Sequence, residues 1–368
     1  MAVTKELNAT ENRQKSLFDQ VADYEHEQVV FCYDKHTGLR SIIAIHNTVL
    51  GPALGGTRMW NYSSEADAIH DVLRLSRGMT FKAAISGINL GGGKAVIIAD
   101  PYKDKSEALW RRYGKFVDSL SGKYITAEDV GTSTADMEYV AMETQHCAGV
   151  PEYMGGGGDP SPVTAYGTYL GMKAAAKKIW GNDSLNGKKV MVQGVGHVGM
   201  YLVKHLIEEH AEVLIADINE KNIANITKDY KVTVVPVSEV YNADVDVYAP
   251  CALGATLNDE TIPQLRCAII AGAANNQLAH EKMHGEMLVE RGILYAPDFL
   301  INAGGLINCY SELDGYDRIR AMAFTEKIYD RTLEIFNFAD KEGITPHEAA
   351  IRVAMKRIED MAKVKSRL

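Results

Sequence analysis

The sequence predicts a two-domain α/β protein with a cleft between the domains. The chain has 368 residues, which is long enough for two domains that each bury a core. Segments typical of strands and helices alternate in both halves, and a glycine-rich motif in the second half lies between a strand and a helix. The predicted domains are residues 1–149 and 150–344, and residues 345–368 are predicted to pack back on the first domain.

Composition narrows the class of protein. Hydrophobic residues make up 46% and charged residues 24% of the chain, which is typical of globular proteins. The net charge of −9 and the lack of a basic block argue against a nucleic-acid partner. No apolar run approaches the roughly 20 residues of a membrane span, and the N-terminus lacks the apolar core of a signal peptide, so we expect a cytoplasmic protein. The cysteines are scattered without CxxC pairs and no HExxH occurs, so no metal site is predicted.

The first half begins with a polar arm and a short helix. Residues 28–33 and 39–46 have the composition of two strands joined by a turn. Residues 51–60, GPALGGTRMW, are predicted to form a glycine-rich loop. A helix is predicted from Ser64 to Lys82, because a capping-box pattern precedes apolar residues at helical spacing.

Two lysines frame the stretch GMTFKAAISGINLGGGK. Lys94 directly follows three glycines, which predicts a glycine loop that presents an amine at the edge of a tight cavity. A buried amine favours its neutral form and becomes usable as a base. The alternative is a flexible loop with a solvated lysine, and the local sequence leaves both open. A buried strand, a helix over 107–120 and a short strand that ends at Glu128-Asp129 complete this half.

The second half contains a dinucleotide-binding fingerprint. Four glycines at 155–158 mark the domain boundary and a possible hinge, and a helix follows. GVGHVG at 194–199 then follows a strand and opens a helix, with Asp217 at the end of the next strand. This context predicts a Rossmann-type domain whose glycines admit the pyrophosphate to the helix N-terminus. An acid at Asp217 accepts hydrogen bonds from a ribose and repels a 2′-phosphate, which favours NAD over NADP.

Later strand candidates are followed by loops that are predicted to line the ligand crevice. Strands are expected at 233–235, 245–248 and 268–271. Asn275 and Asn276 follow the last of these and are candidate ligand contacts, although turn formation also explains them. The stretch INAGGLINCY is predicted to be another strand-to-helix glycine turn, and the tail from Asp317 is predicted to be helical.

Seven motifs, taken together, resemble the amino-acid dehydrogenase superfamily of Glu, Leu, Phe and Val dehydrogenases, most closely its leucine dehydrogenase branch. They are GPALGGTRMW, GMTFKAAISGINLGGGKAVI, YITAEDVGT, GDPSPVTAYG, YAPCALGATLNDETIPQL, AGAANNQL and YAPDFLINAGGLIN. They occur in the family order and cover the chain from about Tyr24 onward. The resemblance implies reversible oxidative deamination of an L-amino acid to a 2-oxo acid and ammonia, with NAD as hydride acceptor. It also implies a homo-oligomer, often an octamer, assembled through the first domain.

The resemblance also assigns roles to individual residues. Lys94 matches the catalytic base, Asp129 matches the carboxylate that exchanges protons with the substrate amine, and Lys82 matches the lysine that binds the α-carboxylate. The charge of Lys82 is expected to help keep Lys94 neutral. Gly55 and Met79 match substrate contacts. The implied cofactor contacts are Thr164, Gly194, Val195, Gly196, His197, Val198, Gly199, Asp217, Ala252 and Asn275, and Asn275 is also expected near the substrate amine.

Four positions bear on the substrate side chain. Glutamate dehydrogenases carry a lysine and a serine where this chain has Leu54 and Cys309, so a substrate γ-carboxylate would be left unpaired here at a cost of several kcal/mol. Phenylalanine dehydrogenases tend to have glycine at the place of Ala127. With Leu306, these residues predict a branched aliphatic substrate: leucine, valine or isoleucine. The alternatives are a phenylalanine dehydrogenase and a non-catalytic NAD-binding regulatory protein.

Overall fold

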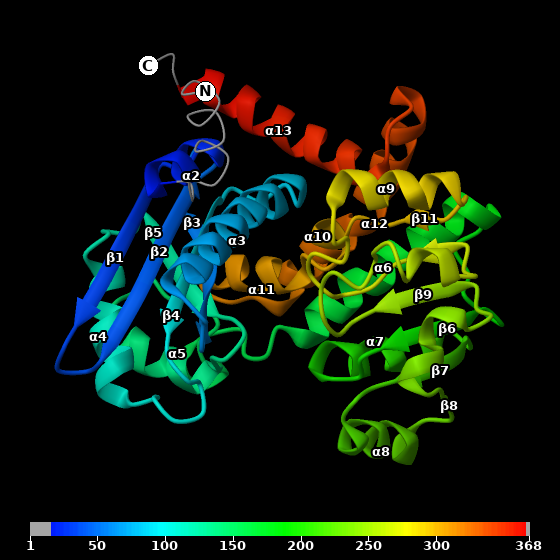
Figure 1. The fold of residues 1–368 in the computed structure, drawn as a ribbon, viewed down its shortest axis with the longest axis horizontal. Coiled ribbons are helices and arrows are strands. Elements are labelled where there is room, and N and C mark those ends of the chain that lie inside the picture. Colours follow the sequence, from blue (N-terminus) through cyan, green and yellow to red (C-terminus); the bar gives the residue numbers. More distant parts are fainter. Residues whose placement is uncertain (1–15, 366–368) are drawn as a thin grey trace, which may run out of the picture.

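Two β-sheets organise the chain, one in each half, with helices packed around them (Figure 1). The computed structural model describes residues 16–365, so the predicted polar arm lies largely outside the described residues. The first sheet has the strand order β1-β2-β4-β3-β5. Its first two pairings are antiparallel, and β3 runs parallel to both β4 and β5. The strands are β1 (Gln28–Asp34), β2 (Leu39–Asn47), β3 (Ala53–Trp60), β4 (Gly91–Ile98) and β5 (Tyr124–Glu128).

Helices of the first half begin at side-chain caps that the sequence supplies. Ser64 accepts a hydrogen bond from the backbone of Asp67 and starts α3, and Ser106 and Ser133 cap the next two helices in the same way. Such caps satisfy amides that have no partner within the helix. The helices are α2 (Leu17–Asp23), α3 (Glu65–Ile85), α4 (Glu107–Asp118) and α5 (Thr134–Ala141).

Two predictions about glycine-rich stretches in the first half are wrong. The stretch at 51–60 is not a loop but contains strand β3, and the triple glycine before Lys94 is not a loop but begins strand β4. A side chain on Gly55 would lie 1.7 Å from the carbonyl oxygen of Gly93, so β3 and β4 approach each other only because these positions lack a Cβ. The local sequence around Gly55 cannot show why a glycine is needed there, since the atom that fills the space belongs to the neighbouring strand β4.

The three glycines of β4 make room for protein atoms. A Cβ on Gly91 would meet the carbonyl oxygen of Asn47 at 2.0 Å, and one on Gly92 would meet the backbone nitrogen of Thr80 at 2.1 Å. A Cβ on Gly93 would meet the ring of Tyr124 at 2.8 Å. The glycines therefore allow α3 and the sheet to pack closely, whereas the sequence analysis predicted a loop that presents the amine at the edge of a cavity.

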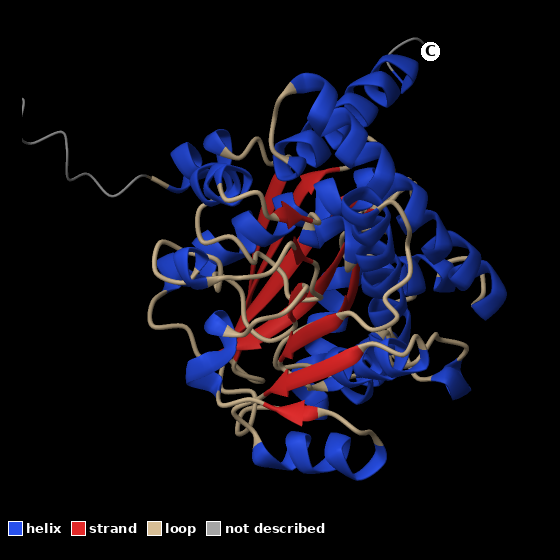
Figure 2. Ribbon diagram, turned by 90° about the vertical axis from the view of Figure 1, so that its right-hand side faces the viewer, coloured by secondary structure: helices blue, strands red, loops and turns tan. Residues whose placement is uncertain are grey.

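The second sheet is entirely parallel, with the strand order β11-β10-β9-β6-β7-β8. Figure 2 shows its strands fanned through the second half of the molecule. The reversal of strand order beside β6 places a crevice at the carboxyl ends of β6 and β9. The strands are β6 (Lys189–Gln193), β7 (Glu212–Ala216), β8 (Thr233–Val234), β9 (Val247–Pro250), β10 (Ile269–Ile270) and β11 (Leu294–Tyr295).

Helices cover this sheet and connect it to the first half. The stretch at 301–310 was predicted to turn from strand to helix, but it runs from the end of α10 into α11, since the preceding strand β11 ends at Tyr295. The helices are α6 (Ser161–Trp180), α7 (His197–Glu208), α8 (Glu220–Asp229), α9 (Glu281–Glu290), α10 (Asp298–Ile301), α11 (Gly304–Glu312), α12 (Arg318–Glu342) and α13 (Pro346–Lys365), with short 3₁₀ helices at Glu152–Met154, Val237–Asn242 and Ile262–Gln264.

The last helix returns to the first half of the chain. Helix α13 contacts α3 as well as α12 and α9 (Figure 1). Arg357 on α13 donates hydrogen bonds to the carbonyl oxygens of Ala84 and Ile88 at 3.0 and 2.8 Å. These carbonyls lie at and just beyond the C-terminal end of α3, where carbonyl groups have no amide within the helix to bond to. Arg357 therefore ties the last helix to the helix that carries Lys82.

Two further observations concern residues 16–365 only. Over this range, no helix is both long and apolar enough to cross a membrane. Over the same range, no group of three or more His, Cys, Asp or Glu side chains is arranged to hold a metal ion.

Candidate active site

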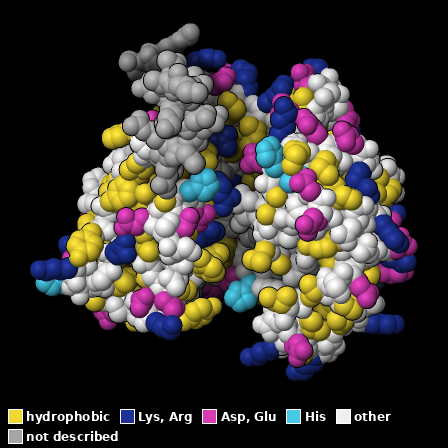
Figure 3. Space-filling model, viewed as in Figure 1, with side chains coloured by type: hydrophobic (Ala, Val, Ile, Leu, Met, Phe, Trp, Pro, Cys, Tyr) yellow, Lys and Arg dark blue, Asp and Glu magenta, His cyan; other side chains and the backbone are white. Residues whose placement is uncertain are grey.

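A cleft of about 1210 Å³ lies between the two halves, and Figure 3 shows the opening between them. The first half contributes β3, α3, β4 and the end of β5 to its wall. The second half contributes the N-terminal ends of α6 and α7, the loop before α9, and α10 and α11. Twelve of the site residues predicted from the sequence line the cleft: Leu54, Met79, Lys82, Lys94, Ala127, Asp129, Thr164, His197, Val198, Asn275, Leu306 and Cys309.

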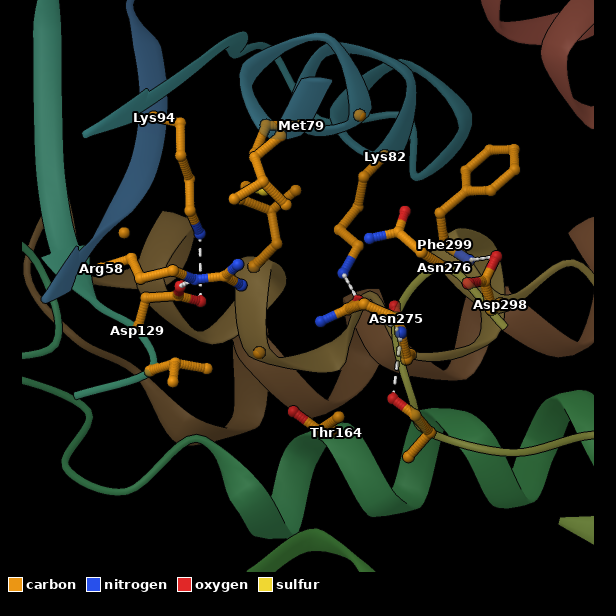
Figure 4. Close-up of a pocket in the computed structure, with 18 of the residues that line it drawn as sticks. Arg58, Met79, Lys82, Lys94, Asp129, Thr164, Asn275, Asn276, Asp298 and Phe299 are labelled. Atoms are coloured by element: carbon orange, nitrogen blue, oxygen red, sulfur yellow. Dashed lines mark hydrogen bonds and ion pairs between the residues drawn. The ribbon is translucent and has the colours of Figure 1, made fainter. Parts of the chain in front are cut away.

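Lys94 and Asp129 form an ion pair inside the cleft. The Lys94 Nζ lies 3.0 Å from Oδ1 of Asp129, and Figure 4 shows the lysine pointing from its strand to the carboxylate. Lys94 is only 5% exposed, because β4 lies between two strands. The Asp129 backbone donates to Oγ1 of Thr132 at 2.8 Å, which fixes the turn after β5. A lysine and a carboxylate in contact can pass protons to and from a bound molecule.

The surroundings favour the neutral amine of Lys94, the form that can act as a base, more than water favours it in an exposed lysine. Burial lowers the pKa of Lys94, Asp129 opposes that shift, and repulsion from Arg58 lowers the pKa further. Burial alone would raise the pKa of Asp129, but attraction to Lys94 and Arg58 brings it down to about 2. Arg58 is therefore a cation that acts on Lys94. Lys82 and Lys94 also repel each other, since this repulsion lowers the pKa of Lys82, so the expected effect of Lys82 on Lys94 stays a prediction.

Lys82 reaches across the cleft to the second half. Its Nζ donates to Oδ1 of Asn275 at 3.1 Å (Figure 4). Asn302 donates to the same oxygen at 2.8 Å. Burial lowers the pKa of Lys82 to about 8, while attraction to Asp298 opposes the shift and repulsion from Lys94 adds to it. An ammonium in this position is suited to bind an anion in the cleft.

Apolar side chains form the wall next to these polar groups. Leu54, Ala127, Leu306 and Cys309 are between 2% and 7% exposed, and Met79 is partly buried beside them. They come from β3, α3, β5 and α11, so both halves of the chain contribute. Gly55 is not among the residues that line the cleft, and its lack of a side chain is explained by its approach to Gly93.

The glycine fingerprint has the geometry that the sequence predicts. Gly194 has a φ of +93° and lies against Ala252, so the turn after β6 needs a residue without a Cβ. A Cβ on Gly199 would lie 2.0 Å from the carbonyl oxygen of Gly194, so close packing explains this glycine. A Cβ on Gly196 would meet nothing within 4 Å, and no side chain caps the start of α7 there. An open helix N-terminus beside a tight turn fits a pyrophosphate.

Asp217 holds this turn in place. Its carboxylate accepts hydrogen bonds from the backbone of Val195 at 2.8 Å and of Asn219 at 2.7 Å. His197 and Val198, at the start of α7, line the cleft, and so does Thr164 on α6 (Figure 4). The fingerprint therefore continues into the cleft that contains Lys94.

Some residues of the site were missed in the sequence. Arg58 binds Asp129, Asn302 binds Asn275, and Glu128 lines the cleft beside Asp129. Arg58 carries one available signal, because a charged residue within a buried strand needs a partner. Its partners, however, lie 13 and 71 residues away along the chain.

Comparison with known proteins identifies the family. The model of the Glu/Leu/Phe/Val dehydrogenase dimerisation domain matches residues 26–146. The model of Glutamate/Leucine/Phenylalanine/Valine dehydrogenase matches residues 155–219 and 211–365. The chain belongs to the Glu/Leu/Phe/Val dehydrogenase family. Membership confirms the resemblance predicted from the seven motifs and the oxidoreductase class, and it implies a nicotinamide cofactor.

Individual members of the family are similar over nearly the whole chain. A leucine dehydrogenase from Thermoactinomyces intermedius is 54% identical, covering 95% of each chain. A phenylalanine dehydrogenase from Bacillus thermotolerans is 47% identical, covering 99% of this chain and 95% of the relative. The crystal structure of L-tryptophan dehydrogenase from Nostoc punctiforme has a TM-score of 0.81 at 46% identity and covers 94% of this chain and 99% of that one. The predicted two-domain α/β fold is confirmed.

Proposed function

We propose that this protein catalyses the NAD-dependent, reversible oxidative deamination of branched-chain L-amino acids, leucine above all and also valine and isoleucine, to the 2-oxo acid and ammonia. The observation that carries the proposal is the buried Lys94–Asp129 pair, which shares one cleft with Lys82 and an apolar wall. The similarity to leucine dehydrogenases over 95% of the chain supports leucine as the substrate.

Lys82 anchors the substrate in this proposal. Its ammonium binds the α-carboxylate, and Asn275, which now accepts its hydrogen bond, is placed to accept one from the substrate amine. Two contacts to polar groups on one carbon fix the orientation of the third substituent, the side chain. Substrate affinity therefore depends on both halves of the protein, because the lysine and the asparagine come from opposite sides of the cleft.

Lys94 and Asp129 accept and donate the protons of the reaction in this proposal. Asp129 is ionised in this arrangement, so it accepts a proton from the substrate ammonium. Once the Cα–N bond has become an imine, neutral Lys94 takes a proton from the water that attacks the imino carbon. The amine nitrogen then receives a proton from Asp129. As the C–N bond breaks and ammonia leaves, the hydroxyl oxygen gives its proton back to the Asp129 carboxylate and becomes the carbonyl of the 2-oxo acid. Lys94 and Asp129 thus each end the cycle with one proton, which passes to solvent.

The residues present fit a nicotinamide dinucleotide. The turn at Gly194 and the open space at Gly196 form a cradle for the pyrophosphate at the start of α7. Asp217 lies at the end of β7 and is suited to bind a ribose hydroxyl rather than a 2′-phosphate, which supports NAD over NADP. Thr164, Ala252 and Asn275 complete the proposed contacts. When bound, the cofactor accepts a hydride from the substrate Cα.

The wall of the cleft supports an aliphatic substrate. A carboxylate side chain would face Leu54 and Cys309 without a partner, at a cost of several kcal/mol. Ala127 and Leu306 narrow the same wall. Phenylalanine is the second candidate, because a 47% identical relative is a phenylalanine dehydrogenase. The glycines at 155–158 are proposed as the hinge by which the cleft closes and excludes water.

The protein is further proposed to be a homo-oligomer, and an octamer in particular. The name of the matching model, a dimerisation domain, supports assembly through the first half of the chain. In that half β1 is an edge strand, and Phe31 and Tyr33 on it are 54% and 68% exposed. Light scattering coupled to gel filtration measures the subunit number.

A panel of L-amino acids, assayed by the absorbance of NADH with NAD and then NADP, tests the proposal. The expected order of kcat/KM places leucine, valine and isoleucine above phenylalanine, and NAD above NADP. A higher value for phenylalanine would replace the assigned substrate. Binding of NAD without turnover of any amino acid would support the alternative, a non-catalytic regulatory protein.

A further inference from the structure

Arg58 lies behind the Lys94–Asp129 pair, and the mechanism above does not use it. Its Nε donates to Oδ2 of Asp129 at 3.0 Å, and its Nη1 donates to Oδ2 of Asp71 at 2.9 Å (Figure 4 labels Arg58 beside Asp129). The Arg58 side chain is 21% exposed. A guanidinium taken largely out of water is costly unless its charge is paired, so the two carboxylates explain how Arg58 is kept there.

The carboxylate of Asp129 is divided between two cations. Oδ1 contacts Lys94 and Oδ2 contacts Arg58, both at 3.0 Å. Asp71 is shared in the same way, because it accepts from Arg58, from Arg74 at 3.0 Å and from the Tyr62 hydroxyl at 2.8 Å. Three cations therefore share two carboxylates in this network.

The excess positive charge is removed most easily by loss of a proton from Lys94. An arginine does not lose its proton in proteins, whereas a lysine does when it is buried or faces other cations. Lys94 is the lysine of the network, and it is buried. Loss of its proton leaves two arginines balanced by two carboxylates, with every hydrogen bond of Arg58 intact.

We propose that Arg58 is a positioning residue that takes up the charge of Asp129, so that Lys94 is free to act as a base near neutral pH. The inference rests on the base role proposed above for Lys94. Asp71 takes part by fixing Arg58 from the side of α3. The influence of each charge agrees with this assignment, since Arg58 lowers the pKa of Lys94 while Asp129 and Asp71 raise it.

The other charged groups on the surrounding elements do not replace Arg58. Lys82 on α3 contacts Asn275 rather than Asp129, and Asp298 on α10 acts on Lys82. Glu128 on β5 adds a further acid beside Asp129. Without Arg58, Lys94 would face Asp129 and Asp71 with one fewer competing cation, and its ammonium would persist to higher pH.

The test is the pH dependence of kcat/KM for leucine deamination in the full-length protein carrying Arg58→Met or Arg58→Lys. We expect Arg58→Met to move the acid limb upward by at least about one pH unit, so that kcat/KM at a pH below both limbs falls about tenfold or more. Near pH 10.5 its kcat/KM should return toward the unmodified value. Arg58→Lys restores a positive charge and should recover part of the shift. Arg40→Met is the matched control, because Arg40 pairs with exposed Glu65 on the surface. The acid limb of its kcat/KM profile should stay at the pH of the unmodified protein.

Two results would overturn the proposal. One is an unmoved acid limb with a rate lowered equally at every pH, which means that Arg58 only shapes the site. The other is equal limbs for Arg58→Lys and Arg58→Met. NADH binding, followed by fluorescence, reports whether each variant is folded. If Arg58→Met is not, Arg58→Lys provides the comparison with a smaller upward shift, and Asp71→Asn, which removes a charge that raises the pKa of Lys94, should move the acid limb downward. Failure of the proposed function is a separate result, since the unmodified protein would then turn over no amino acid.

Discussion

Replacing Gly92 by alanine tests why β4 begins with three glycines. The new Cβ would lie 2.1 Å from the backbone nitrogen of Thr80, whereas ordinary contacts begin at 3.4 Å. The difference, 3.4 − 2.1 = 1.3 Å, is the distance by which α3 or β4 has to move. Overpacking costs about 1–3 kcal/mol, and a clash with backbone belongs at the upper end, which lowers Tm by about 5–10 °C. Because α3 carries Met79 and Lys82, a shift of about 1 Å should also lower kcat/KM on the order of 100-fold.

Scanning fluorimetry and the leucine assay measure both effects. The matched control is Gly78→Ala, since a Cβ on Gly78 meets nothing within 4 Å and this residue lies inside the same helix. That change should raise stability by about 0.5–1 kcal/mol. An unchanged Tm for Gly92→Ala together with lost activity would refute the packing explanation. It would favour the alternative explanation, that the glycines leave room for a ligand beside Lys94.

Three further changes have outcomes set by the structure. Ala127→Gly widens the apolar wall, so the ratio of kcat/KM for phenylalanine over leucine should rise about tenfold or more; an unchanged ratio would mean that this wall does not contact the side chain. Burial raises the pKa of Glu128 to about 7, so its contribution to stability is complete below the unfolded pKa and is lost as pH rises through about 7. Glu128→Gln should therefore raise the free energy of unfolding at pH 8 by about 1–2 kcal/mol and leave it nearly unchanged at about pH 4, and equal gains at both pH values would contradict the shift. Arg357→Met removes hydrogen bonds to carbonyls near the end of α3, so urea unfolding should show a loss of about 2–4 kcal/mol, while a loss below about 0.5 kcal/mol would show that α13 packs without this contact.

The second half of the fold was the easier half to predict. GVGHVG lies between a strand and a helix, and each glycine has a local reason that the sequence pattern expresses, such as the positive φ of Gly194. The predicted strands of the second half also correspond to β6, β7, β8, β9 and β10, although most are shorter than expected. Local patterns suffice here because strand, turn and helix follow each other along the chain.

The structure of the first half was harder to predict, because it depends on contacts between segments that are far apart in the sequence. Gly55 and the glycines before Lys94 are typical of loops in local sequence, yet they lie in strands, because the atoms that fill the place of their side chains belong to other elements. The same distance explains why Arg58 was missed as a cation that acts on Lys94. An ion-pair network between β3, α3 and the end of β5 has no signature at fixed spacing.

The roles of Lys94 and Asp129 came from the family resemblance, and the structure adds the physical reason why the pair is suited to them. Burial of Lys94 lowers its pKa, and the two cations beside Asp129 keep that carboxylate ionised. Residue type and spacing indicate neither effect, since both depend on what packs around the pair.

The most direct test of the central claim is the rate of leucine deamination by Lys94→Ala, measured together with its affinity for NADH. The account predicts a loss of kcat on the order of 1,000-fold or more, since the base of the hydration step is gone, with a Kd for NADH within about twofold because the fingerprint at Gly194 is untouched. A variant that binds NADH normally and retains kcat within about tenfold of the unmodified protein would contradict the assignment of Lys94 as the base.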